Sequence, residues 1–228
     1  MGAWRIAAHA PRRLPIRSAG FARPGPLRDA LVATGVATTV LAGIEIGLLL
    51  EQSYPDVWIG ALFPVVGLIY LAAGLLAWAR RPSSRLGLLI VIGGWTTMLA
   101  ALSNIDTPTT LVVGAVTATL IHAVVAQMLL GFPTGRLHTA AERAVVVGGY
   151  VVCLVLQVPV YAFSPDSPLT IEVDHGLEQT GVYVQRAAGA VIVIGLCALL
   201  VRKLRRATPA QRRVLVPLVV YCMVALAY

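Results

Sequence analysis

Charged side chains are scarce in this sequence. Asp, Glu, Lys and Arg make up 12% of the 228 residues, whereas hydrophobic residues make up 58%. Soluble domains carry roughly 25% charged residues, so this chain has too few charges to cover the surface of a soluble domain. Apolar runs of about twenty residues recur along it, the length needed to cross a hydrocarbon core about 30 Å thick. The composition therefore predicts an all-α, polytopic transmembrane helix bundle.

Patterns of chemically reactive residues are also lacking. The three cysteines, Cys153, Cys197 and Cys222, lie singly in apolar runs, and their odd number argues against a disulfide framework. The sequence has no C-x-x-C spacing, no paired carboxylates and no nucleophile beside a base. We therefore expect no catalytic residue, no metal ligand and no cofactor, and we do not expect the chain as given to be an enzyme.

Seven apolar segments are visible, which gives about seven spans in a transmembrane domain of residues 30–228. They cover residues 30–50, 57–79, 86–103, 110–130, 144–163, 182–201 and 214–228. The last has fifteen residues, or about 22 Å of helix. This is shorter than the membrane core, so we expect a short span or a chain truncated before further domains.

The loops between these segments alternate in charge. Residues 1–29, 80–85, 131–143 and 202–213 hold all but one of the 18 basic residues, whereas the opposite loops hold seven of the 10 acids. Basic loops stay in the cytoplasm, so the N-terminus is predicted to be cytoplasmic and the protein to lie in the plasma membrane. The basic arm of residues 1–29 is expected to meet anionic lipid headgroups rather than nucleic acid.

Two helix starts carry recognisable signals. Thr139 with Glu142 and Thr208 with Gln211 fit the capping box, in which each side chain satisfies an unpaired backbone amide of the first turn. Both pairs precede apolar segments. They predict that the fifth and seventh helices begin about one turn before their lipid-buried parts.

The stretch GFPTGR at residues 131–136 invites comparison with a phosphate-binding loop. A Walker loop needs G-x-x-x-x-G-K-[ST] after a strand, but only three residues separate Gly131 from Gly135, and an apolar helix precedes them. Residues 132–135 instead suit a type I turn with proline second and glycine fourth. We interpret the stretch as a hinge that leaves Arg136 at the lipid boundary.

This turn also carries a family resemblance. LLGFPTGRLHTAAERAVV, followed by RRATPAQRRVLVPLVV two helices later, resembles the N-terminal membrane region of actinobacterial sensor histidine kinases. The matching residues are Phe132, Pro133, Gly135, Arg136 and Leu137, then Arg212, Arg213, Leu215 and Pro217. The resemblance implies a multi-helix sensor that leads into a dimerisation helix and an ATP-binding kinase domain. The phosphoacceptor and nucleotide-binding motifs of those domains are not in this sequence.

Polar residues inside the spans are candidate functional groups. Glu45 lies between Gly43 and Gly47, a G-x-x-x-G face suited to close helix packing. Arg186 and Gln157 are at a similar depth, which raises the hypothesis of a contact between Glu45 and Arg186 within a polar cluster. The alternative is that each charged side chain reaches the interface separately.

His122 and Gln127 form a second candidate polar site, nearer the membrane midplane. The leading function hypothesis is a signal-sensing membrane module, with the lipid bilayer, a second copy of the chain and a cytoplasmic signalling protein as candidate partners. The alternative is a small stand-alone transporter or channel, for which few polar groups are available to line a pathway.

Overall fold

The computed structural model describes residues 24–51, 57–165, 167, 169–207, 212–213, 216–217 and 220. The regular elements of these residues are all helical. They are α1 (Pro24–Glu51), α2 (Val57–Arg80), α3 (Leu86–Ala101), the 3-10 turn η1 (Leu102–Asn104), α4 (Pro108–Thr117), α5 (Leu120–Gly131), α6 (Ala140–Leu154), α7 (Gln157–Phe163) and α8 (His175–Arg206).

Six helical segments in the described chain are long and apolar enough to cross a membrane. Four of them are α1, α2, α3 with η1, and α8; the other two are α4 with α5, and α6 with α7. They coincide with the first six predicted spans, and the architecture is compatible with a multi-pass membrane protein. The seventh predicted span, 214–228, lies outside the described residues except at positions 216, 217 and 220.

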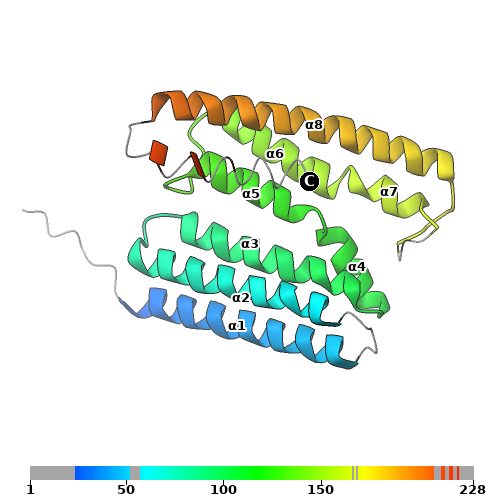
Figure 1. Cartoon of the computed structure of the whole chain (residues 1–228), viewed down its shortest axis with the longest axis horizontal. Coiled ribbons are helices and arrows are strands. Elements are labelled where there is room, and N and C mark those ends of the chain that lie inside the picture. Colours follow the sequence, from blue (N-terminus) through cyan, green and yellow to red (C-terminus); the bar gives the residue numbers. More distant parts are fainter. Residues whose placement is uncertain are drawn as a thin grey trace, which may run out of the picture.

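Successive spans run in opposite directions, so the loops gather at two ends of the bundle (Figure 1). The start of α1, the turn at residues 81–85, the loop at residues 132–139 and the end of α8 lie together; we call this the basic end. The end of α1 and the loops after η1 and α7 lie at the other end, the acidic end (Figure 1). The loops predicted to share a side of the membrane therefore do share an end of the bundle.

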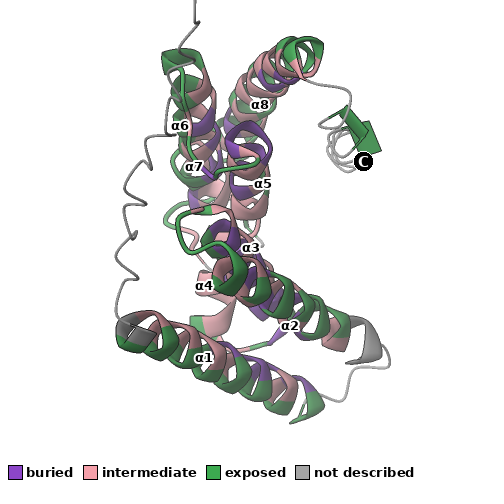
Figure 2. Cartoon of the chain, turned by 90° about the vertical axis from the view of Figure 1, so that its left-hand side faces the viewer, coloured by how far each residue is buried: buried purple, intermediate pink, exposed green. Residues whose placement is uncertain are grey.

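Laterally, the bundle has two parts that meet between α3 and α5. α1 packs on α2 and α2 on α3, while α5 packs on α6 and α8, and α7 packs on α8. α1 and α8 lie on opposite sides of the molecule in both views (Figures 1 and 2). Many large apolar side chains point outward, for example Val40, Ile69 and Ile194, as expected of helices that face lipid.

Glycines allow the close packing of α2 on α3. A β-carbon at Gly87 would lie 2.5 Å from the backbone nitrogen of Trp78, and one at Gly74 would lie 2.9 Å from the carbonyl oxygen of Gly87. Gly67 on α2 and Gly94 on α3 make a similarly close contact further along the same two helices. Small residues at such positions let helix backbones approach in a membrane, where packing rather than water exclusion holds helices together.

The G-x-x-x-G face predicted for α1 is not used in this way. Gly43 and Gly47 are exposed, and a β-carbon at either would have nothing within 4 Å. α1 instead packs on its neighbours through an adjacent face of the helix, which holds the buried residues Thr38, Ala42 and Leu49. No helix that the structure describes therefore packs closely on that face, because the spacing of small residues alone does not say which face of a helix meets a neighbour.

Candidate functional site

Two of the six spans are broken near their middle, and the breaks face each other. The fourth span is interrupted at Ala118 and Thr119, between α4 and α5, and the fifth at Val155 and Leu156, between α6 and α7. Pro159 explains the second break, because proline cannot donate to the carbonyl of Val155, four residues earlier. No proline or glycine marks the first break, so local sequence gave no signal for it.

A hydrogen-bonded clamp joins the two breaks. The hydroxyl of Thr119 donates to Gln157 Oε1 and lies 3.3 Å from the carbonyl oxygen of Cys153. Gln157 Nε2 donates to the carbonyl of Ala115 at 2.9 Å. In an unbroken helix that carbonyl would pair with the amide of Thr119, so the Gln157 side chain inserts into the backbone ladder of the fourth span. Gln157 is 5% exposed, and both ends of its amide are satisfied.

A pocket of about 210 Å³ lies beside the clamp, and we call it the break pocket. Its lining residues come from the fourth span, α6 and α8: Thr119, His122, Ala123, Ala126, Gly149, Val152, Cys153, Gln185, Gly189, Ile192, Val193 and Leu196. The wall is mainly apolar with a few polar groups, which is typical of small-molecule sites. It suits a small, largely apolar molecule with one or two hydrogen-bonding atoms.

The predicted pair of His122 and Gln127 does not form one site. His122 is exposed, its Nδ1 lies 3.0 Å from the carbonyl oxygen of Thr119, and it lines the break pocket. Gln127 instead accepts a 2.7 Å hydrogen bond from the Tyr150 hydroxyl, which joins α5 to α6. The two residues are five apart on α5 and therefore point to different neighbours.

The predicted cluster of Glu45, Arg186 and Gln157 is likewise not assembled. Glu45 on α1 is completely buried, and neither carboxyl oxygen has a hydrogen-bond partner. Arg186 is exposed on α8, across the bundle, and Gln157 is engaged in the clamp. Counting residues along each span gave the depth of these groups but not their lateral position.

Glu45 lies level with an irregular point of α2. Gly35 lies beside Leu75, and Leu49 lies beside Gly60; this antiparallel register places Glu45 at the level of Pro64, which is also fully buried. Proline cannot donate to the carbonyl of the residue four positions earlier. Unpartnered buried polar groups are uncommon in native proteins, so Glu45 stays a functional candidate.

The predicted hinge at the basic end is a docked turn, and its register differs from the expectation. The carbonyl of Gly131 accepts from Thr134 N–H at 3.1 Å and from Gly135 N–H at 2.7 Å, with Pro133 third in the turn after a cis peptide bond. The turn therefore begins at Gly131 and is not a type I turn over 132–135. Gly135 follows with φ of 74°, a left-handed conformation that favours glycine.

Contacts outside the turn explain this register. The amide of Arg85 donates to the carbonyl of Thr134 at 2.9 Å, and the hydroxyl of Ser84 lies 3.2 Å from the same oxygen. A β-carbon at Gly135 would lie 2.5 Å from the backbone nitrogen of Leu86. These contacts fasten the turn to the loop between α2 and α3, and a local sequence pattern cannot reveal them.

The other turn residues divide between core and surface. Leu137 packs on the apolar cluster of α5, α6 and α8, Phe132 is partly buried, and Arg136 is exposed. The end of α8 reaches the end of α5, directly before the turn, because Lys203 Nζ donates to the carbonyl of Leu130 at 2.7 Å. The turn therefore contacts both lateral parts of the bundle.

The capping box predicted at Thr139 and Glu142 is confirmed. Thr139 Oγ1 accepts from the amide of Glu142 at 3.1 Å, and Glu142 Oε2 accepts from the amide of Thr139 at 3.0 Å. The second predicted box, at Thr208 and Gln211, lies outside the described residues. Within the described ranges, no group of three or more His, Cys, Asp or Glu side chains could hold a metal ion.

Comparison of the chain with protein-family models, curated proteins and solved structures found no match. The class of the protein therefore follows from its fold, a helical bundle compatible with a multi-pass membrane protein. Its functional candidates are the clamp with the break pocket, the buried Glu45 and the docked turn.

Proposed function

We propose that the chain is a signal-sensing membrane module that takes a small, largely apolar molecule in the break pocket. The observation that carries this proposal is the position of α8, which lines two separate sites. Gln185, Gly189 and Ile192 line the break pocket, whereas Lys203, about three turns beyond Ile192, donates to the Leu130 carbonyl at the end of α5, directly before the turn at the basic end. A ligand that displaces α8 at the break pocket would also displace it at the turn.

Switching of this kind requires that the ligand bind two packings of the helices with different affinity. The clamp supports such behaviour, because it holds the fourth and fifth spans in one arrangement while α8 closes the pocket from the other side. We propose that the basic end is cytoplasmic, as the distribution of basic residues predicts, and that it meets a cytoplasmic signalling partner. The resemblance to histidine-kinase sensor regions favours the same partner class.

The test is to fill the pocket and to measure the response at the basic end. Gly189→Leu adds a side chain where a β-carbon would have only Val152 within 4 Å, at 3.9 Å. Spin labels at Arg85→Cys and Arg205→Cys, in a chain without its native cysteines, report the distance between α3 and the end of α8. We expect Gly189→Leu to shift this distance and Gly43→Leu, on the exposed face of α1, to leave it unchanged. If the distance between the labels were the same in Gly189→Leu as in Gly43→Leu, the proposed coupling between the break pocket and the basic end would be contradicted.

The orientation is tested separately. Reporter enzymes fused after Ser167 and after Arg206 should report opposite compartments, with Arg206 on the cytoplasmic side. If both report one compartment, the threading of α8 is wrong and the sensor proposal fails with it.

One observation favours a second candidate, a small transporter or channel. Transporters often bind substrate near the midplane between interrupted helices, and α4 with α5 and α6 with α7 are two interrupted spans that face each other. Reconstitution in vesicles distinguishes the candidates. Protein-dependent flux of protons, or of small neutral solutes, that Gln157→Leu abolishes would favour transport, and absence of such flux favours sensing.

A further inference from the structure

A second pocket, of about 250 Å³, lies at the basic end between the end of α8 and the loop that joins α5 to α6. We call it the basic pocket. Its lining residues are Phe132, Pro133, Thr139, Glu142, Leu199, Arg202, Lys203, Arg206 and Ala207. It shares no residue with the break pocket, and the proposed function does not use it as a binding site.

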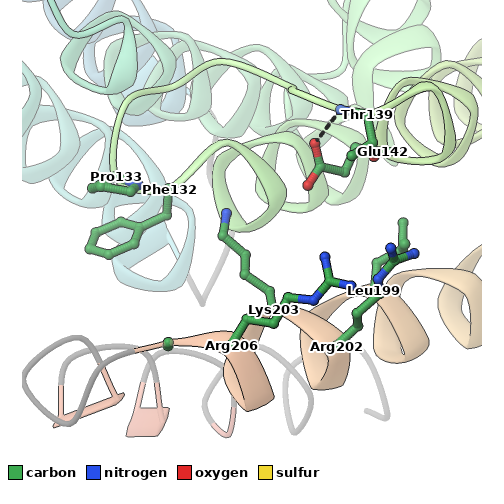
Figure 3. A pocket seen from close by; sticks show the side chains of 9 residues that line it. Phe132, Pro133, Thr139, Glu142, Leu199, Arg202, Lys203 and Arg206 are labelled. Carbon is green, nitrogen blue, oxygen red and sulfur yellow. Dashed lines mark hydrogen bonds between the residues drawn. The ribbon is translucent and has the colours of Figure 1, made fainter.

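Three cationic side chains gather in this pocket. Arg202, Lys203 and Arg206 rise from the last turns of α8, and Lys203 reaches toward the turn that holds Phe132 and Pro133 (Figure 3). The hydrogen bond from Lys203 to the carbonyl of Leu130 holds its ammonium group there. An ammonium group has three N–H donors, so this bond leaves donors for a ligand.

Glu142 is the one acid among the lining residues. Its Oε2 already accepts from the backbone amides of His138, at 2.7 Å, and Thr139, at 3.0 Å, in the capping box. The carboxylate therefore has a structural role at the start of α6, and its single charge, which also acts on Lys203, offsets only part of the charge of the three cations. Between residues that the structure describes, the only ion pair joins His175 and Glu178 at the acidic end.

The remaining wall is apolar. Phe132, Pro133 and Leu199 stand beside the cations, and α8 becomes continuously apolar on the N-terminal side of Arg202. A pocket at the end of a span, cationic on one side and apolar on the other, matches a phosphate group with an attached hydrocarbon chain. Arginine and lysine are the side chains that bind phosphate most often.

From these observations we propose that the basic pocket binds a phosphate-bearing group, either an anionic phospholipid headgroup or a soluble phosphate. The competing explanation is that Arg202, Lys203 and Arg206 only follow the positive-inside pattern. In that case attraction to anionic lipid would depend on total charge and not on which cations are present. Arg143 and Arg205 provide the matched comparison, because both are exposed at the basic end and neither lines the pocket.

The experiment uses the full chain in nanodiscs of phosphatidylcholine with a small fraction of phosphatidylglycerol, and counts retained phosphatidylglycerol by native mass spectrometry. We expect Arg202→Gln/Arg206→Gln to lower retention at least tenfold and Arg143→Gln/Arg205→Gln to lower it less than twofold. The first pair leaves the hydrogen bond of Lys203 in place, so the bundle should stay folded. Equal losses in the two pairs, or no loss in either, would overturn the proposal.

A gain-of-binding variant provides an independent arm. Glu142→Gln removes the negative charge but keeps a side chain that can complete the capping box. Retention of phosphatidylglycerol should rise several-fold. An unchanged or lower retention in a folded Glu142→Gln variant would contradict binding in the basic pocket.

The source of the phosphate is decided by competition. Inorganic phosphate and glycerol phosphate are titrated into wild-type nanodiscs at constant ionic strength. Displacement at millimolar concentration identifies a soluble phosphate as the ligand. Retention of phosphatidylglycerol throughout the titration identifies the lipid headgroup, and in both cases the dependence on Arg202 and Arg206 must hold.

Discussion

The clamp between the two helix breaks yields the most direct prediction, and Gln157→Leu is the perturbation. Leucine is similar in size and apolar, so it fills the buried site without hydrogen bonding. It removes the bond with the Thr119 hydroxyl and the bond to the Ala115 carbonyl together. The two breaks would then be held by apolar packing alone.

The magnitude follows from the value of such bonds in membranes. Hydrogen bonds between transmembrane helices contribute about 0.6 kcal/mol on average and about 1.7 kcal/mol at most. Gln157→Leu loses two of them, so we expect a loss of about 1–3 kcal/mol in the free energy of unfolding. Thr119→Val loses one, and we expect about 1 kcal/mol. Since the two side chains share a bond, the double variant should be less destabilised than the sum by about 1 kcal/mol.

The assay is reversible unfolding in mixed micelles, followed by the helical circular dichroism signal and analysed as a double-mutant cycle. Gln185→Leu is the control, because Gln185 lies on the same pocket but makes only a 3.4 Å contact, with the carbonyl of Val152. Gln185→Leu should lower the free energy of unfolding by less than about 0.5 kcal/mol. Strictly additive effects of Gln157→Leu and Thr119→Val, or an increase in stability with Gln157→Leu, would refute the clamp.

Three further predictions, on helix packing, on the docked turn and on the helix cap, use the same unfolding measurement. Gly87→Ala should cost about 1–3 kcal/mol, because its β-carbon meets the backbone of Trp78. Gly43→Ala should be neutral or stabilising by up to about 1 kcal/mol, because its site is open; similar losses in the two would contradict the close packing of α2 on α3. Gly135→Ala should cost about 1–3 kcal/mol through its positive φ and should speed proteolysis at the turn, whereas wild-type cleavage rates would show that the turn is not docked. Thr139→Ala should cost about 1 kcal/mol through loss of the cap, which Thr139→Ser should restore; equal losses in both would exclude the capping hydroxyl as the cause.

Sequence alone determined the features that depend on local chemistry. The length of each apolar run predicted six of the helical spans, because a fixed membrane thickness requires a fixed helix length. The charges of the loops predicted which loops share an end of the bundle, and Thr139 with Glu142 predicted a helix start. Pro159, which accounts for the break in the fifth span, is a signal of the same local kind. Each of these signals lies within a few residues of the feature it specifies.

Only the tertiary structure decided which distant groups meet. Depth along the spans suggested a pairing of Glu45 with Arg186, yet α1 and α8 lie on opposite sides of the bundle (Figure 1). The break at Thr119 depends on Gln157, 38 residues away in the sequence. The register of the turn at Thr134 depends on hydrogen bonds from Ser84 and Arg85. Helix periodicity and charge fix how far a residue lies along a span and which face it occupies. They do not fix which helix stands beside that face, because lateral order in a bundle is set by the packing of all the helices at once.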